Sequence, residues 1–140
     1  MSHLTRRIAV LYGGRSSERE VSLRTGKAVF DALHAAGRNV VLIDVGLDVA
    51  ERLRAEKVDV AFVALHGRYG EDGCIQGLLE SLSIPYSGSG VVASSLGMDK
   101  ILTRLVLTRA GIPMVPGIDV PAEEATRLTA KDIPYGFPCI

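Results

Sequence analysis

The chain has 140 residues, of which 47% are hydrophobic and 23% charged, and its formal net charge is zero. This composition predicts a globular protein with one core of ordinary size, and the balanced charge argues against nucleic acid or an anionic membrane as a partner. Cys74 and Cys139 match neither a metal-ligand spacing nor a disulfide framework, and every apolar run is too short for a signal-peptide core or a membrane span, so we expect a cytoplasmic protein.

The first 88 residues alternate short apolar runs with amphipathic stretches. This alternation predicts parallel strands joined by right-handed helical crossovers, and hence a Rossmann-like α/β fold with an open, mainly parallel sheet and flanking helices. The run VDVAFVAL is apolar nearly throughout, as expected of a strand that is covered on both faces. We expect strands at residues 8–12, 39–45, 58–65 and 84–88, and helices at 17–36, 50–57 and 74–82.

The helix expected at residues 17–36 carries its own start and stop signals. Ser17 and Glu20 have the spacing of an S-x-x-E capping box, and Gly37 has the position of a C-terminal cap. The helical period places one set of small and apolar residues on a common, core-facing side: Val21, Thr25, Ala28, Val29, Ala32, Leu33 and Ala36.

The pattern changes after about Ser87. Residues 87–97 are small and glycine-rich, which predicts a connector or a short helix, and residues 99–111 predict a helix with Asp99 as N-cap. A further helix is expected at residues 121–129, and a strand begins at 136–140. We therefore expect an N-terminal α/β domain at residues 1–97 and the incomplete beginning of a second domain at 98–140.

The glycine turn after the first strand indicates the kind of ligand. Gly13 and Gly14 lack the third glycine of the dinucleotide-binding motif, and acids in the first helical turn would repel a phosphate. Asp44 has the position of a ribose-binding acid. The missing third glycine and the acids of the first turn nevertheless argue against a dinucleotide site. Glu20 is explained by the capping box, whereas Glu18 is not needed there. A carboxylate at this position suits a cation, such as the ammonium group of a small amino acid.

The loop ALHGRYGEDG follows the third strand directly. It places His66 at the same sheet edge as Glu18, where the imidazole is equally consistent with ligand contact and with a structural role. Asp72 is expected to cap the following helix, and Arg68 and Glu71 are expected to pair with each other in the loop.

Four segments together resemble the N-terminal third of D-alanine–D-alanine ligases of the ATP-grasp superfamily: AVLYGGRSSEREVSL, VALHGRYGEDG, IPYSGSGVVASSLGMDK and AGIP. The resemblance covers nearly all of residues 7–140, with the motifs in the family's order. It implies that residues 1–97 form the pre-ATP-grasp substrate domain and that residues 98–140 begin the central ATP-grasp domain. Ser95 and Cys139 differ from the residues commonest in the family, but neither belongs to a motif.

The resemblance also implies roles for individual residues. Glu18 matches the catalytic-site glutamate that holds the ammonium group of the first D-alanine. Val21 and Ser22 match positions beside that substrate, and His66 matches a histidine near it, which favours ligand contact. Lys100, in the sequence MDK, matches a lysine that reaches the nucleotide phosphates. No residue of this chain matches a metal ligand, and the ligands of the expected Mg²⁺ would lie beyond residue 140.

The implied reaction is ATP-dependent ligation of two D-alanines through an acylphosphate, which supplies a peptidoglycan precursor. We expect this chain to provide the first D-alanine site, to be inactive alone, and to belong to a homodimer that binds neither nucleic acid nor membrane. Two alternatives remain open: a ligase that uses D-lactate or D-serine as the second substrate, and a non-catalytic nucleotide-binding α/β module.

Overall fold

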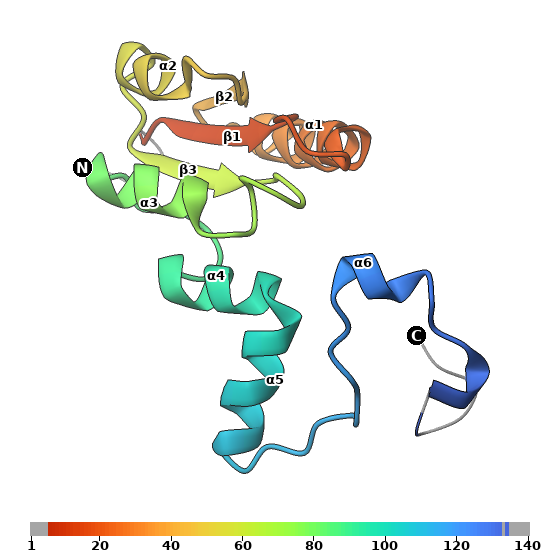
Figure 1. The fold of residues 1–140 in the computed structure, drawn as a ribbon. Coiled ribbons are helices and arrows are strands. Elements are labelled where there is room, and N and C mark those ends of the chain that lie inside the picture. Colours follow the sequence, from red (N-terminus) through yellow and green to blue (C-terminus); the bar gives the residue numbers. More distant parts are fainter. Residues whose placement is uncertain (1–5, 133, 135–140) are drawn as a thin grey trace. The chain divides into compact units, whose positions relative to one another are not determined.

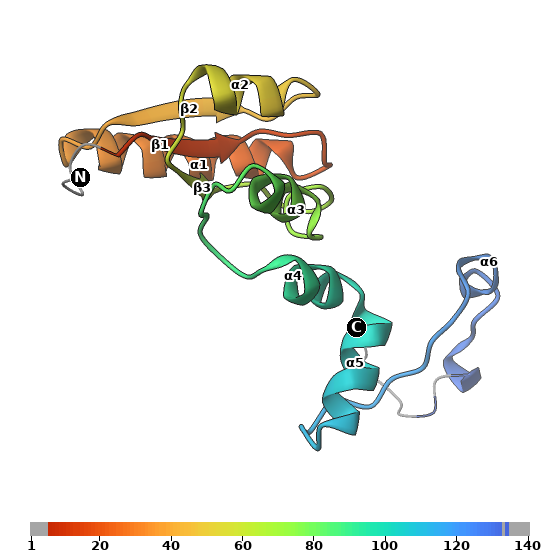
Figure 2. The ribbon, with the colours of Figure 1, turned by 90° about the vertical axis from the view of Figure 1, so that its left-hand side faces the viewer.

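The computed structural model describes residues 6–132 and 134, and contacts divide the chain into two compact units, Met1–Met98 and Asp99–Ile140. The described part of the first unit contains an open parallel sheet of β1 (Ile8–Tyr12), β2 (Val40–Asp44) and β3 (Val60–Val63) in the order β2-β1-β3 (Figures 1 and 2). The predicted open, parallel α/β sheet is confirmed. Its helices are α1 (Arg19–Ala35), α2 (Val49–Ala55), α3 (Cys74–Ser81) and α4 (Val91–Met98).

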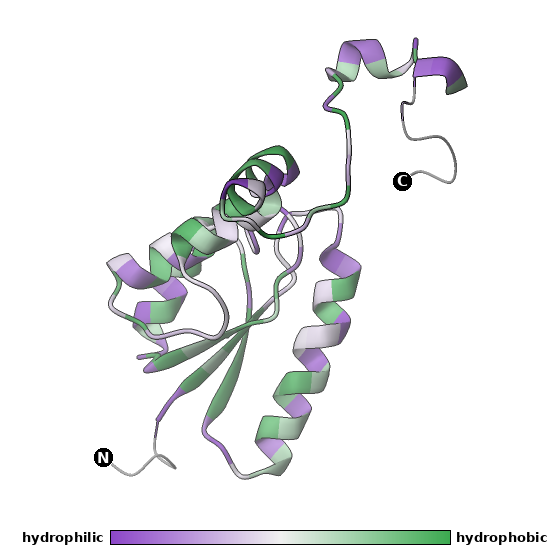
Figure 3. Ribbon diagram, turned by 90° about the horizontal axis from the view of Figure 1, so that it is seen from below, coloured by the Kyte–Doolittle hydropathy of each residue, from purple (hydrophilic) through white to green (hydrophobic). Residues whose placement is uncertain are grey.

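The core lies mainly between the sheet and the helices α2 and α3. Leu11 and Ile43 on the strands, and Leu53 and Leu79 on the helices, have no exposed surface. The opposite face is covered by α1, so that both faces of the sheet are packed, and the strands are correspondingly hydrophobic (Figure 3). This explains why the strand pattern in the sequence was apolar and not alternating.

The fourth predicted strand is reduced to one isolated bridge between Tyr86 and Ala61. The amide of Ala61 donates to the carbonyl of Pro85 at 2.9 Å, and the amide of Ser87 donates to the carbonyl of Ala61 at 3.0 Å. Pro85 has no amide hydrogen to donate, so the pairing is limited at that residue.

One prediction for α1 is wrong and another is only partly right. The helix begins one residue after Glu18, which is the N-cap and forms no side-chain cap bond, so the Ser17–Glu20 capping box does not form. The fully buried residues of α1 are Ser22 and Gly26, which are not on the predicted face; of that face Thr25, Val29 and Leu33 are partly buried, whereas Val21 is 39% exposed. The reason is close packing, because a Cβ atom on Gly26 would lie only 2.3 Å from the Cβ atom of Tyr12.

The second unit contains α5 (Lys100–Arg109), α6 (Ala122–Ala125) and a short 3₁₀ helix at Ala130–Asp132. The predicted N-cap is confirmed, since the amide of Leu102 donates to Oδ1 of Asp99 at 2.9 Å. The helix predicted at 121–129 is limited to the four residues of α6, none of which is buried, so no packing supports a longer helix. The predicted strand at 136–140 lies outside the described residues. The assignment of this unit to an ATP-grasp domain stays a prediction.

Candidate functional site

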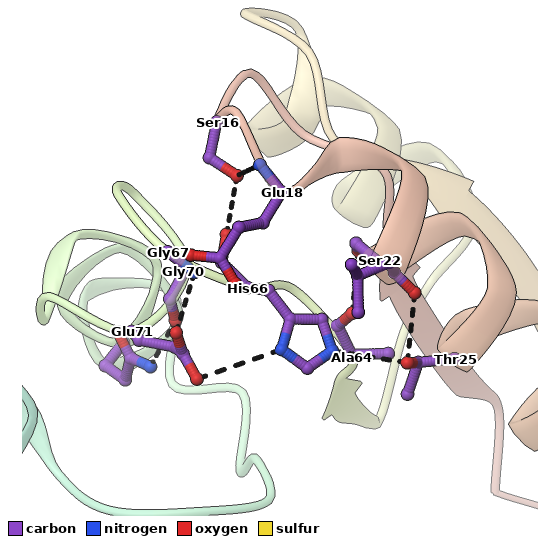
Figure 4. Close-up of polar contacts among 11 residues, drawn as sticks. Ser16, Glu18, Ser22, Thr25, Ala64, His66, Gly67, Gly70 and Glu71 are labelled. Atoms are coloured by element: carbon purple, nitrogen blue, oxygen red, sulfur yellow. Dashed lines mark hydrogen bonds and ion pairs between the residues drawn. The ribbon is translucent and has the colours of Figure 1, made fainter.

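The candidate site lies at the carboxyl edge of the sheet, where the loops after β1 and β3 meet. The chain leaves β1 toward β2 and later crosses back to β3, so the connections diverge between β1 and β3. Ligands of open α/β sheets gather at such switch points. The loop after β1 carries Glu18, and the loop after β3 carries His66 (Figure 4).

Glu18 extends from the start of α1 toward Gly67 and His66 (Figure 4). A Cβ atom on Gly67 would lie 2.8 Å from Oε1 of Glu18, so the absence of a side chain at this position makes room for the carboxylate. The residue is exposed, and within residues 6–132 and 134 no hydrogen bond or ion pair engages its carboxylate. The negative charge is therefore available to a ligand.

Ser16 connects the two loops. Its hydroxyl donates to the carbonyl of His66 at 2.7 Å and accepts from the amide of Glu18 at 3.1 Å. Sequence reasoning assigned the role at the helix start to the neighbouring Ser17 and missed this link between segments 50 residues apart. The bond fixes the start of α1 relative to the loop that carries the imidazole.

His66 is partly buried and has polar partners on both ring nitrogens. Nε2 lies 3.2 Å from Oγ1 of Thr25, and Nδ1 lies 3.9 Å from Oε1 of Glu71. The single hydroxyl hydrogen of Thr25 is donated to the carbonyl of Val21 at 3.0 Å. With the Thr25 hydroxyl hydrogen so committed, the contact with His66 has Nε2 donating to Oγ1 of Thr25, while Nδ1 faces the carboxylate of Glu71.

The remaining loop contacts correct one prediction. Glu71 does not pair with Arg68, because its Oε2 accepts from the amide of Gly67 at 2.7 Å. The guanidinium of Arg68 lies instead over the ring of Tyr69, 5.0 Å from the ring centroid. The Glu71 carboxylate is thus bound by the Gly67 backbone amide, and this hydrogen bond closes the loop beside His66 into a turn.

Asp72 is not the N-cap of α3, as was predicted, because Gly73 takes that position, but its carboxylate accepts hydrogen bonds around the start of the helix. Its Oδ2 accepts from the amide of Tyr69 at 2.8 Å, and its Oδ1 accepts from the amide of Cys74 at 3.1 Å. Desolvation opposes ionisation of this carboxyl, but the hydrogen bonds from these amides outweigh it and hold its pKa below the ordinary value. The carboxylate is therefore committed to the loop.

Val21 and Ser22, both predicted to line the substrate site, lie in different environments. Val21 is 39% exposed, whereas Ser22 has no exposed surface and donates to the carbonyl of Ala64 at 2.7 Å. This hydrogen bond ties α1 to the end of β3, and the predicted place of Ser22 beside the substrate stays a prediction. Lys100 is the first, exposed residue of α5 in the second unit, and its phosphate-binding role stays a prediction.

Gln76 was not found from the sequence. It is only 5% exposed, and its Nε2 donates to the carbonyl of Gly70 at 2.8 Å. A glutamine on the buried side of α3 was the available signal, but helical periodicity alone does not distinguish a polar anchor from a solvated residue. Gln76 and His66 line one cavity of about 530 Å³ on the α1 side of the loop.

Asp44 does not serve as a free ribose-binding acid. Arg19 makes two hydrogen bonds to it, at 2.7 Å to Oδ1 and 2.5 Å to Oδ2. The bond from Arg19 is the main cause that lowers the pKa of Asp44 below its ordinary value. The acid is thus neutralised within the scaffold, which agrees with the sequence argument against a dinucleotide.

We expect the Arg19→Gln variant to raise the pKa of Asp44 toward its ordinary value. Because the folded-state pKa of Asp44 is depressed, its contribution to stability is present above the unfolded-state pKa and is lost as pH falls through the folded-state pKa. The stability difference between wild type and Arg19→Gln should therefore shrink in acid. Carboxyl NMR titration and denaturant unfolding at several pH values measure both effects. Arg24→Gln, at an exposed site on α1, is the control, and an unchanged Asp44 pKa in Arg19→Gln contradicts the assignment.

The described residues show neither a metal cluster nor a membrane span. Within 6–132 and 134, no three His, Cys, Asp or Glu side chains are grouped so that they could hold a metal ion. Among the described helices, none is long and apolar enough to cross a membrane.

The structure is thus an open parallel α/β sheet whose carboxyl edge presents an unpaired carboxylate beside an imidazole. The N-terminal region of the D-ala D-ala ligase family matches residues 7–50 and 46–89. The chain belongs to this family.

Known proteins support the assignment along nearly the whole chain. The D-alanine--D-alanine ligase of Anaeromyxobacter sp. strain K is 58% identical over 135 residues, which cover 96% of this chain, and ligase B of Pseudomonas putida is 58% identical over 134. The crystal structure of the Bacillus anthracis D-alanine--D-alanine ligase is similar to this chain, with a TM-score of 0.73 and 38% identity. The matched region covers 88% of this chain and 42% of that protein. The chain spans 44% and 42% of the length of the two curated relatives.

Proposed function

We propose that this chain is the N-terminal substrate-binding part of an ATP-dependent D-alanine–D-alanine ligase, in which Glu18 holds the ammonium group of the first D-alanine. The observation that carries this proposal is the unpaired Glu18 carboxylate, which points across Gly67 at the switch point of the sheet. A cation there gains a charge-assisted hydrogen bond that the protein itself does not supply. The names of the relatives support the choice of D-alanine as the amino acid.

The surrounding residues position that substrate. The exposed part of Val21 provides apolar surface close to Glu18 for the methyl side chain, and the partly buried imidazole of His66 lies on the same edge. Ser16 and Ser22 hold the two loops and α1 in register. In this arrangement the substrate is fixed by its ammonium end, which leaves its carboxylate free to face the nucleotide.

The proposed reaction has two steps. The carboxylate of the first D-alanine attacks the γ-phosphorus of ATP, so that an acylphosphate forms and ADP leaves. The amine of the second D-alanine then attacks the acyl carbon, the tetrahedral intermediate expels phosphate, and the amine loses a proton as the peptide bond forms. Phosphoryl transfer depends mainly on positioning and charge neutralisation, and Glu18 contributes to the positioning.

In this proposal the second unit contributes to nucleotide binding through Lys100. Lys100 follows Met98 and Asp99 and is not part of a Walker loop, so it would contact phosphate as a point charge. A similar structure, that of the Bacillus anthracis ligase complexed with ATP, has a TM-score of 0.70 and 37% identity. Among the described residues, no three His, Cys, Asp or Glu side chains are grouped so that they could bind the Mg²⁺ implied by the resemblance.

The family resemblance supports three further parts of the proposal. The dipeptide product serves as a peptidoglycan precursor, the enzyme works in the cytoplasm, and two copies form a homodimer through their N-terminal domains. Neither nucleic acid nor a membrane is a proposed partner, in keeping with the zero net charge.

The test is an acceptor comparison in the complete enzyme that contains these residues. ATP-dependent product formation is measured with D-alanine first and D-alanine, D-lactate or D-serine second. We expect D-alanyl-D-alanine as the main product. Preference for D-lactate or D-serine would assign the enzyme to the related ligases, and NAD binding without any ligation would support the non-catalytic module.

We expect the 140-residue chain alone to be inactive, because the relatives continue well beyond the part that it matches. Purified chain should neither hydrolyse ATP nor form dipeptide when ADP release and product are followed by chromatography. The complete enzyme, assayed in parallel, is the positive control. Turnover that co-purifies with the chain through successive columns would refute this expectation.

A further inference from the structure

A second cavity lies on the other side of the His66 loop, next to the glycine turn. It has a volume of about 210 Å³, below the range of about 300–1,000 Å³ that is typical of sites for drug-sized ligands, so it suits a smaller molecule. Its apolar wall comes from the β2–α2 loop, the loop after β3 and the helices α2 and α3: Val45, Leu47, Val49, Leu65, Ile75 and Leu78. Glu18 is absent from its lining, although Ser16 and His66 of the proposed ammonium site belong to it, so the two sites are neighbours.

The polar part of this cavity consists of Arg15, Arg68 and Tyr69, which we call the arginine–tyrosine cluster. The guanidinium carbons of Arg15 and Arg68 lie 4.7 Å and 5.0 Å from the centroid of the Tyr69 ring. Cation–π contacts of exposed arginines are stable in themselves, at about 0.5–1 kcal/mol. Because both guanidinium groups lie over the same ring, however, their positive charges repel each other.

The cluster has no counter-charge within the part of the chain that the structure describes. Neither Arg15 nor Arg68 forms an ion pair there. Three acids of the neighbouring loops already have other partners: Asp44 pairs with Arg19, Glu71 accepts from Gly67, and Asp72 accepts from Tyr69 and Cys74. Glu18 is unpaired, but it does not line this cavity and forms no ion pair with either arginine. In a chain of zero net charge, two unpaired cations beside an apolar cavity are a local imbalance that an external anion would relieve.

We propose that this cavity binds a small carboxylate with an apolar body, whose anionic end lies at the arginine–tyrosine cluster. The apolar wall favours a hydrocarbon body over a bare inorganic anion, and the planar guanidinium group matches carboxylate geometry. Free Glu18 at the start of α1 disfavours a doubly charged phosphate nearby. The site does not depend on the ligase function, since it uses neither Glu18 nor the nucleotide.

The cavity shares Leu65, His66 and Gly70 with the larger cavity on the α1 side. A ligand of the arginine–tyrosine cluster therefore contacts the loop that carries His66, and its binding should shift the amide signals of that loop as well as those of residues 13–16.

The experiment compares 4-methylpentanoate with 4-methylpentanamide, which has the same shape but no charge, by amide NMR titration of the ¹⁵N-labelled chain. We expect the carboxylate to bind about tenfold more tightly, with the largest shifts at residues 13–16 and 65–75. Arg15→Gln and Arg68→Gln should each weaken carboxylate binding about three- to fivefold, and the exposed-site control Arg54→Gln should not.

Several outcomes would overturn the proposal. Equal binding of acid and amide would show that the arginines are not the recognition element. Shifts confined to the first turn of α1 would place the ligand at the Glu18 site instead, and the absence of saturable shifts at millimolar ligand would exclude a site. Because the acid–amide comparison uses the unmodified chain, it holds even if a variant folds poorly. The outcome of this titration is independent of the ligase assay: if the complete enzyme showed no ligase activity, the proposed function would fail, but carboxylate binding to this cavity would still be tested.

Discussion

Replacing Glu18 by glutamine in the complete enzyme is expected to lower kcat/KM for the first D-alanine about 100-fold. The substitution keeps the size of the side chain but removes the charge that pairs with the ammonium group, and such a charge-assisted bond contributes about 1.5–3 kcal/mol. Most of the loss should appear as a higher KM, with a smaller loss in kcat because the substrate carboxylate is less well oriented. Steady-state rates over a wide range of D-alanine concentration, fitted with separate constants for the first and second D-alanine sites, measure both effects.

Glu20→Gln is the matched control for this substitution. Glu20 lies two residues further along, exposed in the first turn of α1. Its kinetics should stay within about twofold of wild type, since surface substitutions away from a site have small effects. Wild-type kinetics of Glu18→Gln would remove Glu18 from the substrate site, and equal losses in both variants would indicate a general effect of charge at the helix start.

Replacing Gly26 by alanine is expected to destabilise the first unit by about 2–3 kcal/mol. The new Cβ atom would lie 2.3 Å from Cβ and 2.9 Å from Cγ of Tyr12, so α1 would have to move away from the sheet. Because Ser22 and Glu18 belong to the same helix region, the substrate edge should be disturbed together with the core. Urea unfolding followed by circular dichroism measures the free energy of unfolding.

Gly77→Ala provides the control for the intrinsic preference of a helix for alanine. Gly77 lies in α3, and a Cβ atom there would meet nothing nearer than Cγ2 of Val91 at 3.9 Å, an ordinary contact. This variant should gain about 0.5–1 kcal/mol. If Gly26→Ala were as stable as wild type while Gly77→Ala gained stability, the close approach of α1 to Tyr12 would be disproved.

The sheet and its connections were predictable from the sequence because they depend on local patterns. Apolar strand runs, helical periods and glycine stops are each encoded within a few residues, and the right-handed crossover rule then limits the topology. The position of His66 and Glu18 at one edge followed from that topology. The identity of the substrate did not follow from spacing, and it entered only through resemblance to known ligases.

What was missed depends on contacts between distant segments. The closest contact of α1 with the sheet is that of Gly26 with Tyr12, although the exposed Val21 is a better candidate by period alone. The pairing of Glu71 with the Gly67 amide, in place of Arg68, results from how the loop closes. Backbone amides compete with side chains for acids, and sequence spacing does not show which partner wins.

The hydroxyl of Ser16 spans the two loops of the site, since it donates to one backbone and accepts from the other. The segments that carry the acid and the imidazole therefore form one mechanical unit, although they are far apart in the sequence. Enlarging this edge for a bulkier ligand would consequently require coordinated changes in both segments, because altering the geometry of either would displace the other.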